Sequence, residues 1–235
     1  MFHYFDPMYF VFLAPGMLLA AWAQWRVSSA YAQGSQIPSS RNLTGAQAAQ
    51  AIMDAEGVSG VSIEPIGGQL TDHYDPRGKV LRLSEGVYGS TSLAALGIAA
   101  HEVGHAIQDA HKYTPLVVRN LIVPVAGFGS QAAFIVMIAG ALLNMTNLVF
   151  IGVGLFSTVV VFQLVNLPVE FDASRRARAA LAMTGMVSPD EDRTVGKVLN
   201  AAAMTYVAAT LTSILTLLYY CFRLGLLGGN RSSDD

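Results

Sequence analysis

The run His101-Glu102-Val103-Gly104-His105 is the most chemically informative part of the sequence. Residues four positions apart lie one above the other on a helix, so His101 and His105 can reach the same metal ion. Two imidazoles suit Zn²⁺, and Glu102 on the adjacent edge could take a proton from a water that the metal activates. The alternative is a pair of histidines buried in an apolar core, which costs free energy unless both side chains find polar partners.

Glu170 is the leading candidate for the third protein ligand that a catalytic zinc site requires. It comes directly after the uncharged run 120–169, where a carboxylate near lipid needs a partner. The sequence predicts a helix that begins after Pro168, so two alternative roles for this carboxylate remain open. It could be stabilised by the dipole at that helix N-terminus, or it could pair with Ser174 or Arg178 on the same helix.

Other polar residues could orient the ligands or stabilise a developing negative charge. Asp172 could accept a hydrogen bond from a ligand histidine, or pair with Arg175 or Arg176 on its own helix. His73, Tyr74 and Arg175 are candidates for the donor that stabilises an oxyanion. His73 also fits a surface position on a hairpin, and Tyr74 also fits an apolar contact.

Composition places these residues in a membrane protein. Of the 235 residues, 53% are hydrophobic and 13% are charged, with a mean hydropathy of +0.45, whereas soluble domains carry about 25% charged residues. The apolar residues are gathered into uncharged runs, and about 20 residues of helix cross a bilayer. The sequence therefore predicts four transmembrane helices, at 7–25, 120–143, 148–167 and 198–222, the middle two joined by the polar turn 144–147.

The lysines and arginines orient the predicted helices. Four spans place 26–119 and 168–197 on one side, with twelve of the 14 basic residues, and leave Arg223 and Arg231 on the other. By the positive-inside rule the basic side is cytoplasmic, and 223–235 is a tail on the opposite side.

Residues 26–119 have the pattern of a small α+β domain, and we expect the chemistry to lie there and in the helical segment 168–197. Thr44 and Gln47 form a capping-box pattern, which predicts a helix that stops at Gly57. Strands are predicted near 61–66, 69–74 and 79–83, and the metal-binding helix at about 91–109. Strand 79–83 could receive an extended substrate by strand addition, or it could be a plain hairpin edge.

Several classes of protein are excluded or disfavoured. The formal net charge of −2 and the lack of any nucleic-acid-binding motif predict no nucleic-acid partner. The single cysteine, Cys221, cannot form an internal disulfide. The first helix could be a cleaved signal peptide, because Ala30-Tyr31-Ala32 resembles a processing site, but residues 1–7 lack the positive charge of a signal peptide, which favours an uncleaved anchor.

Four stretches together resemble the bacterial YugP-type membrane-bound neutral zinc metallopeptidases: 70–76 (LTDHYDP), 81–84 (LRLS), 99–108 (AAHEVGHAIQ) and 170–174 (EFDAS). The resemblance covers nearly the whole chain. It implies a zinc endopeptidase of the cell membrane with one Zn²⁺ per chain, His101, His105 and Glu170 as ligands and Glu102 as base. The layout is also similar to the HtpX-like membrane proteases, whose matching motif ends in Asp where this chain has Ser174. Ser174 is therefore a further candidate for a residue that orients a ligand or donates to an oxyanion.

The expected protein is therefore a mainly α integral membrane protein, with four transmembrane helices and a small α+β zincin-like cytoplasmic domain. It would lie in the bacterial inner membrane and hydrolyse proteins or peptides, membrane proteins among them. An intramembrane-cleaving metalloprotease is disfavoured, because the uncharged run 86–101 is short for a span. A membrane scaffold or assembly factor with a structural or inactive zinc site is the other alternative, and the sequence leaves the oligomeric state open.

Overall fold

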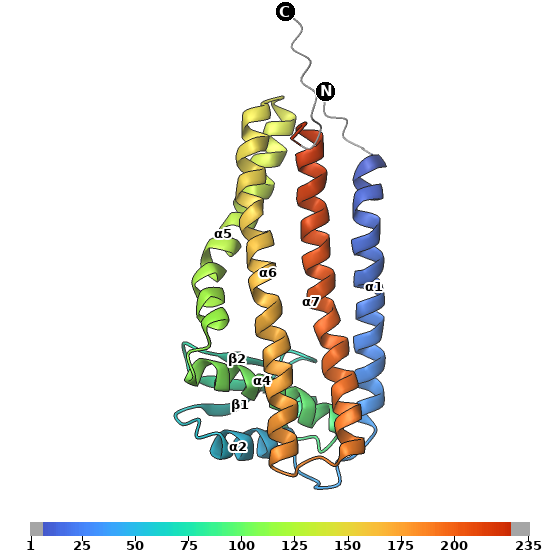
Figure 1. Ribbon diagram of the computed structural model, residues 1–235, viewed down its shortest axis with the longest axis vertical. Helices are drawn as coiled ribbons and strands as arrows, with labels where there is room; N and C mark the ends of the chain where they lie inside the picture. The colour runs from blue at the N-terminus through green and yellow to red at the C-terminus, as the bar shows by residue number, and fades with distance from the viewer. Residues whose placement is uncertain (1–6, 227–235) are drawn as a thin grey trace, which may run out of the picture. The chain divides into compact units, whose positions relative to one another are not determined.

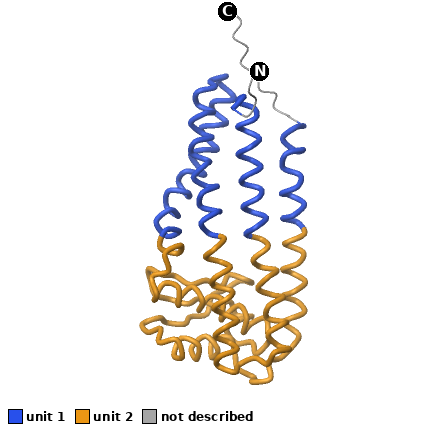
Figure 2. The backbone as a smooth tube through the Cα atoms, viewed as in Figure 1, with its two compact units in different colours: residues 1–21, 118–166, 206–235 blue, residues 22–117, 167–205 orange. Residues whose placement is uncertain are grey.

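The computed structural model describes residues 7–226, so most of the predicted tail 223–235 lies outside the described residues. Contacts divide the chain into two compact units, shown in Figure 2. Unit 1 comprises Met1–Ala21, Val118–Asn166 and Tyr206–Asp235, and unit 2 comprises Trp22–Val117 and Leu167–Thr205.

Four long helices carry the apolar runs: α1 (Pro7–Ser35), α5 (Thr114–Leu142), α6 (Thr146–Met183) and α7 (Pro189–Arg223) (Figure 1). Each is long and apolar enough to cross a membrane. Together with a small three-stranded sheet, they confirm the predicted class, a mainly α membrane protein with a small α+β domain.

One predicted helix start is wrong. The sequence predicts a new helix after Pro168, but α6 runs without interruption from Thr146 to Met183 with Pro168 inside it. Proline lacks a backbone N–H and normally ends or kinks a helix, but long apolar helices packed among others tolerate it. Glu170 therefore lies well inside a helix, which excludes stabilisation by an N-terminal helix dipole.

In unit 1, glycines allow close packing between helices. A Cβ on Gly152 of α6 would lie 2.3 Å from Cγ of Met137 on α5, and one on Gly16 of α1 would lie 2.6 Å from Oγ1 of Thr212 on α7. The α5–α6 turn contains Asn144 with φ 54°, a conformation that asparagine tolerates better than most residues. These small residues let apolar helices pack by close backbone approach.

In unit 2, short helices flank the sheet. Helix α2 (Gly45–Ala55) begins with the predicted capping box of Thr44 and Gln47, and α3 (Glu85–Tyr88) precedes α4 (Leu93–Ala110), which carries both histidines. One apolar core joins them to the sheet and to parts of α6 and α7. Its fully buried members include Ile52, Met53, Leu81, Leu83, Leu96, Val103, Leu181 and Val195.

The sheet has the order β1-β3-β2. Strand β3 (Val80–Ser84) pairs in parallel with β1 (Ser62–Ile66) and antiparallel with β2 (His73–Asp75). Because β3 is the central strand, the hypothesis that strand 79–83 pairs with a substrate is wrong: both of its edges are already hydrogen-bonded. The Asp75 carboxylate accepts the N–H groups of Arg77 and Gly78 at 2.9 and 3.2 Å and closes the predicted hairpin turn.

Candidate active site

Helix α4 positions His101, Glu102 and His105 on a buried, well-capped segment. The Ser92 hydroxyl accepts the N–H of Ala95 at 3.2 Å and satisfies one of the free donors of the first turn. Beyond that turn, apolar residues of α4 anchor the helix in the core of unit 2. The two imidazole rings stand one turn apart with centroids 4.9 Å from each other, as the spacing of the motif predicts.

The Glu170 carboxylate lies against both imidazoles. Its Oε2 is 3.3 Å from Nε2 of His101 and 3.6 Å from Nε2 of His105. One ligand-type atom from each of the three residues falls within 4.8 Å of the others. Glu170 is 4% exposed and His105 8%, while His101 is half-buried, so the cluster is largely withdrawn from solvent. The structure thus brings together two segments that are more than sixty residues apart in the chain.

Gly104, between the two histidines, explains how α6 comes close enough to α4. A Cβ at this position would lie 2.5 Å from the carbonyl oxygen of Ala173 on α6. That neighbour is backbone and cannot rotate away, so only glycine fits at this crossing. Glu170 lies about one turn before Ala173 on the same helix, and the close approach therefore carries its carboxylate to the histidines.

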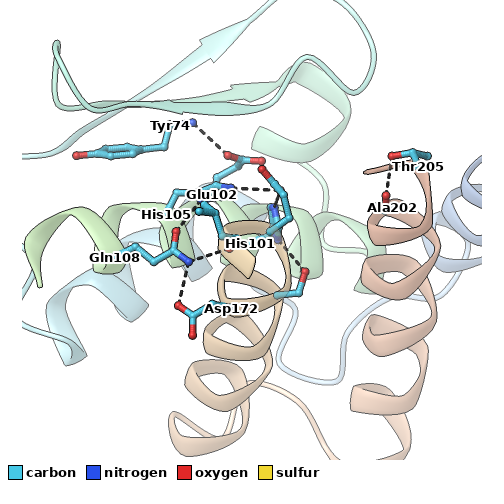
Figure 3. Close-up of polar contacts among 11 residues, drawn as sticks. Tyr74, His101, Glu102, His105, Gln108, Asp172, Ala202 and Thr205 are labelled. Atoms are coloured by element: carbon cyan, nitrogen blue, oxygen red, sulfur yellow. Dashed lines mark hydrogen bonds and ion pairs between the residues drawn. The ribbon is translucent and has the colours of Figure 1, made fainter. Parts of the chain in front are cut away.

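Gln108 connects His105 to Asp172. Its Oε1 is 3.0 Å from Nδ1 of His105, and its Nε2 donates to the carbonyl of Val169 at 2.8 Å and to Oδ2 of Asp172 at 2.9 Å (Figure 3). Both of the latter groups only accept hydrogen bonds, so the amide oxygen must face His105. His105 consequently carries its proton on Nδ1, and its Nε2 lone pair faces Glu170.

Of the two roles weighed for Asp172, the structure shows the pairing with arginines of its own helix and not a direct hydrogen bond to a histidine. It reaches His105 indirectly, through Gln108, and it pairs with two arginines of its own helix. Nε of Arg176 lies 2.6 Å from Oδ2, and Arg175 contacts Oδ1. With Asp172 3% exposed, these charges offset the cost of burying its carboxylate. Because Arg175 pairs with Asp172, it is a poor candidate for the donor that stabilises an oxyanion.

Ser174 orients the other histidine. Its Oγ lies 3.1 Å from Nδ1 of His101, which leaves Nε2 of that ring directed at Glu170. The intrahelical pairs weighed for Glu170 are therefore wrong: Ser174 contacts His101, and Arg178 instead pairs with Asp192 at 2.5 Å. In metal-binding histidines, the distal ring nitrogen, which is the one that does not face the metal, regularly makes a hydrogen bond. Here the distal nitrogen is Nδ1, and both imidazoles have such a contact.

Glu102, next to His101 on α4, directs its carboxylate toward the sheet. Its Oε2 accepts the backbone N–H of Tyr74 on β2 at 3.1 Å (Figure 3). The Tyr74 hydroxyl donates to Oδ2 of Asp109 at 2.6 Å, and Nζ of Lys79 lies 2.5 Å from the same oxygen. Burial, with the hydrogen bond to Asp109, raises the pKa of Tyr74 well above its ordinary value.

These contacts change the expected roles of the remaining candidates. The Tyr74 hydroxyl is engaged with Asp109, so the residue contributes to the site through its backbone N–H to Glu102. The Nδ1 of His73 lies 2.8 Å from the carbonyl of Thr71, a local turn contact of a half-buried residue. Among the described residues, neither side chain makes a hydrogen bond to the histidines or to Glu170.

Sequence reasoning missed Gln108 and Gly104 as parts of the site. A signal for Gln108 was present, because it lies three residues after His105 and therefore on the same helix face, within reach of the ring. The role of Gly104 depends on which backbone crosses α4, and that cannot be deduced from the motif itself.

The residues present fit Zn²⁺. Two imidazole nitrogens and one carboxylate oxygen are a common donor set of catalytic zinc sites. The proton of His105 is held on Nδ1 by Gln108, so the nitrogen that faces Glu170 is the one able to bind a metal. With these three protein ligands, a Zn²⁺ ion held here would keep a fourth coordination position for water, which hydrolysis by a zinc site requires.

Comparisons with known proteins agree with this chemistry. A family model described as "Putative neutral zinc metallopeptidase" matches residues 9–225. The chain is 46% identical over 214 residues to a Bacillus subtilis (strain 168) protein named "Putative membrane protease YugP", covering 91% of this chain and 95% of that protein. No solved structure matches. The sequence motifs, the buried cluster and these matches lead to one conclusion: the chain belongs to the neutral zinc metallopeptidase family of membrane proteins.

Proposed function

We propose that the protein is a zinc-dependent endopeptidase that hydrolyses peptide bonds in proteins or peptides at the membrane. The observation that carries this proposal is the convergence of His101, His105 and Glu170, with both distal ring nitrogens hydrogen-bonded. A merely structural pair of buried histidines would not need a carboxylate at 3.3 and 3.6 Å from the proximal nitrogens together with an ordered hydrogen bond on each distal one.

In this proposal His101, His105 and Glu170 hold one Zn²⁺ per chain. When bound, the ion supplies Lewis acidity that activates water and polarises the scissile carbonyl. Glu102 is the general base: it accepts a proton from the attacking water and then donates it to the leaving amine. The N–H of Tyr74 fixes the Glu102 carboxylate through one oxygen and leaves the other oxygen for this transfer.

The residues around the ligands keep them in place during this reaction. Gln108 fixes the tautomer of His105, and the contacts of Gln108 and Ser174 hold the two rings in the orientation in which Nε2 faces Glu170. Asp172, neutralised by Arg175 and Arg176, anchors the amide of Gln108. Because the contacts of Gln108 and Ser174 join α4 to α6, they also oppose a separation of the two helices that carry the ligands.

For the placement of the chain, we propose that segments 26–119 and 168–197 face the cytoplasm and that 7–25, 120–143, 148–167 and 198–222 cross the bacterial cell membrane. The asymmetric distribution of lysine and arginine supports this orientation. Alkaline phosphatase fused after Asp235 should be active, since the enzyme works only outside the cytoplasm, and a fusion within 26–119 should be inactive. The reverse result would invert the topology.

Replacing Glu102 tests the proposed activity. The purified chain in detergent would be incubated with a quenched-fluorescent peptide library of mixed sequence, with and without a zinc chelator. Glu102→Gln should lower the cleavage rate by on the order of 10²–10⁴-fold and leave zinc bound. Glu64→Gln, an exposed glutamate outside the site, should cleave like the wild type.

Two results would contradict the proposal. Cleavage at the wild-type rate by Glu102→Gln would exclude this residue as the base. If the wild-type chain holds zinc but shows no cleavage that the chelator abolishes, a membrane scaffold with a structural zinc site would be favoured.

A further inference from the structure

A polar cavity of about 300 Å³ lies within unit 2, between the second half of α1 and the beginning of α7. It shares no residue with the zinc-binding cluster. The lining residues are Arg26, Ser29, Ala30, Gln33, Gly34, Ile37, Thr194 and Lys197. Two of them are cations and none is an anion.

The two cations are not neutralised by ion pairs in the described part of the chain. No carboxylate forms an ion pair with Arg26 or Lys197 within the described range 7–226. Arg26 instead stacks over the ring of Trp22, 5.2 Å from its centroid. Two like charges in one cavity repel each other, and an anionic ligand between them would relieve that repulsion.

The same cavity offers hydrogen-bond donors at its wall. Nε2 of Gln33 donates to Oγ of Ser29 at 3.1 Å, which leaves the Ser29 hydroxyl hydrogen available to a ligand. Thr194 adds a second hydroxyl from α7. Gly34, in the cavity wall, lets α1 and α7 pack closely, since a Cβ there would lie 3.1 Å from Cγ2 of Val198. Two cations and two hydroxyls are a suitable set of partners for a phosphate group.

Arg26 and Lys197 also mark where two apolar runs meet the polar part of the chain. Arg26 directly follows the uncharged run 7–25, and Lys197 directly precedes the run 198–222. The cavity is therefore at the level where lipid headgroups lie. Exposed apolar side chains accompany it: Trp22 at 41% and Trp25 at 65% on α1, and Ile37 at 41% in the cavity wall just after α1. Aromatic rings at this level are typical neighbours of acyl chains and glycerol backbones.

We propose that this cavity binds the phosphate of an anionic phospholipid headgroup, with Arg26 and Lys197 as its cationic partners and Ser29 and Thr194 as donors. A basic pocket between membrane helices on the cytoplasmic side suits such a ligand. The site ties the start of α7 to α1 and does not depend on the proposed peptidase activity. A free phosphate ion shares the same chemistry, and the experiment separates the two sources.

Trp22 and Trp25 are the only tryptophans in the chain. Trp22 stacks against Arg26 of the cavity and Trp25 directly precedes Arg26, so their fluorescence reports on lipid there. The full-length protein would be reconstituted into phosphatidylcholine vesicles with increasing amounts of brominated phosphatidylglycerol, whose bromine atoms quench indole fluorescence. Brominated phosphatidylcholine gives the reference curve. Lys197→Gln removes one cation without touching the Trp22 stack, and Arg26→Gln removes the other. The control is Arg193→Gln, an exposed arginine on the same helix that pairs with Asp190.

The proposal predicts that brominated phosphatidylglycerol quenches the tryptophan fluorescence at a lower mole fraction than brominated phosphatidylcholine does. Each cavity substitution should weaken this preference about fivefold. Arg193→Gln should behave like the wild type. Equal quenching by the two lipids, or an equal loss in the control, would overturn the proposal. Inorganic phosphate that abolishes the preference, where sodium chloride of the same ionic strength does not, would assign the cavity to a soluble phosphate and overturn the lipid assignment.

Discussion

The amide oxygen of Gln108 lies 3.0 Å from Nδ1 of His105, one turn earlier on α4. Because the two protons on the amide nitrogen are both donated, to Val169 and Asp172, this contact fixes the protonated nitrogen of the ring. A side chain that is fully buried and makes no hydrogen bond to Glu170 thus sets which imidazole nitrogen faces the ligand cluster.

Removing that amide should weaken zinc binding. Gln108→Met keeps the length of the side chain but leaves the His105 ring without its acceptor, and zinc affinity should fall by about 10–100-fold. Competition with a fluorescent chelator measures this affinity. Gln50→Met is the control, since that exposed amide pairs only with Asp54 at 2.8 Å on α2. Unchanged affinity in Gln108→Met would show that the contact does not support the metal.

Ser174 should support the other proposed ligand, His101, in the same way. Ser174→Ala removes the partner of His101 Nδ1, so zinc affinity should decline, while Ser174→Asp restores an acceptor at the same position. We expect the aspartate variant to bind zinc at least as tightly as the wild type, since a carboxylate is the stronger acceptor. The same chelator competition measures the zinc affinity of both variants. A zinc affinity of Ser174→Asp below that of Ser174→Ala would contradict the role assigned to Ser174.

Gly104→Ala should separate α4 from α6. The added methyl group would lie 2.5 Å from the Ala173 carbonyl oxygen, which is backbone and cannot move alone. We expect a loss of about 1–3 kcal/mol in stability, together with reduced zinc occupancy as Glu170 is displaced. Thermal unfolding and metal analysis measure the two effects.

Gly154→Ala is the matched control on α6, because nothing lies within 4 Å of a Cβ there. It should be neutral or slightly stabilising, since alanine favours a helix more than glycine does. If the two variants behaved alike, the steric argument for Gly104 would be wrong.

The raised pKa of Tyr74 predicts an alkaline limit to stability. Burial and the bond to Asp109 favour the protonated phenol in the folded state, so the contribution is complete below the unfolded pKa of about 10. It is lost as pH rises through the folded pKa. The midpoint of thermal unfolding in detergent should therefore fall more steeply above about pH 10 in the wild type than in Tyr74→Phe. Parallel curves for the two proteins would contradict this.

How far the sequence alone determines this structure differs from one residue to another. The four apolar runs, the capping box at Thr44 and the helix that carries His101 follow from composition and local pattern, and the structure contains each of them. Local pattern misled at Pro168, where a helix start was predicted, because packing in a membrane helix overrides the usual effect of proline.

Contacts between distant segments were harder to predict. Glu170 could be proposed as a ligand because an isolated carboxylate beside an apolar run demands a partner. The identity of that partner depends on the crossing of α4 and α6 at Gly104, which is a tertiary feature. The assignment of strand 79–83 as an edge failed for the same reason, since the pairing of β1 with β3 joins residues that are not adjacent in the chain.

The most direct test of the proposed site is the zinc content of the purified chain, with the wild type and Glu170→Ala washed identically with chelator. We predict about one zinc per chain in the wild type, as one site of three ligands requires, and a large loss in the variant. Glu191→Ala, which removes a carboxylate that contacts Ser40 and Ser188 outside the site, should keep its zinc. Full zinc retention in Glu170→Ala, or no zinc in the wild type, would contradict the proposed site.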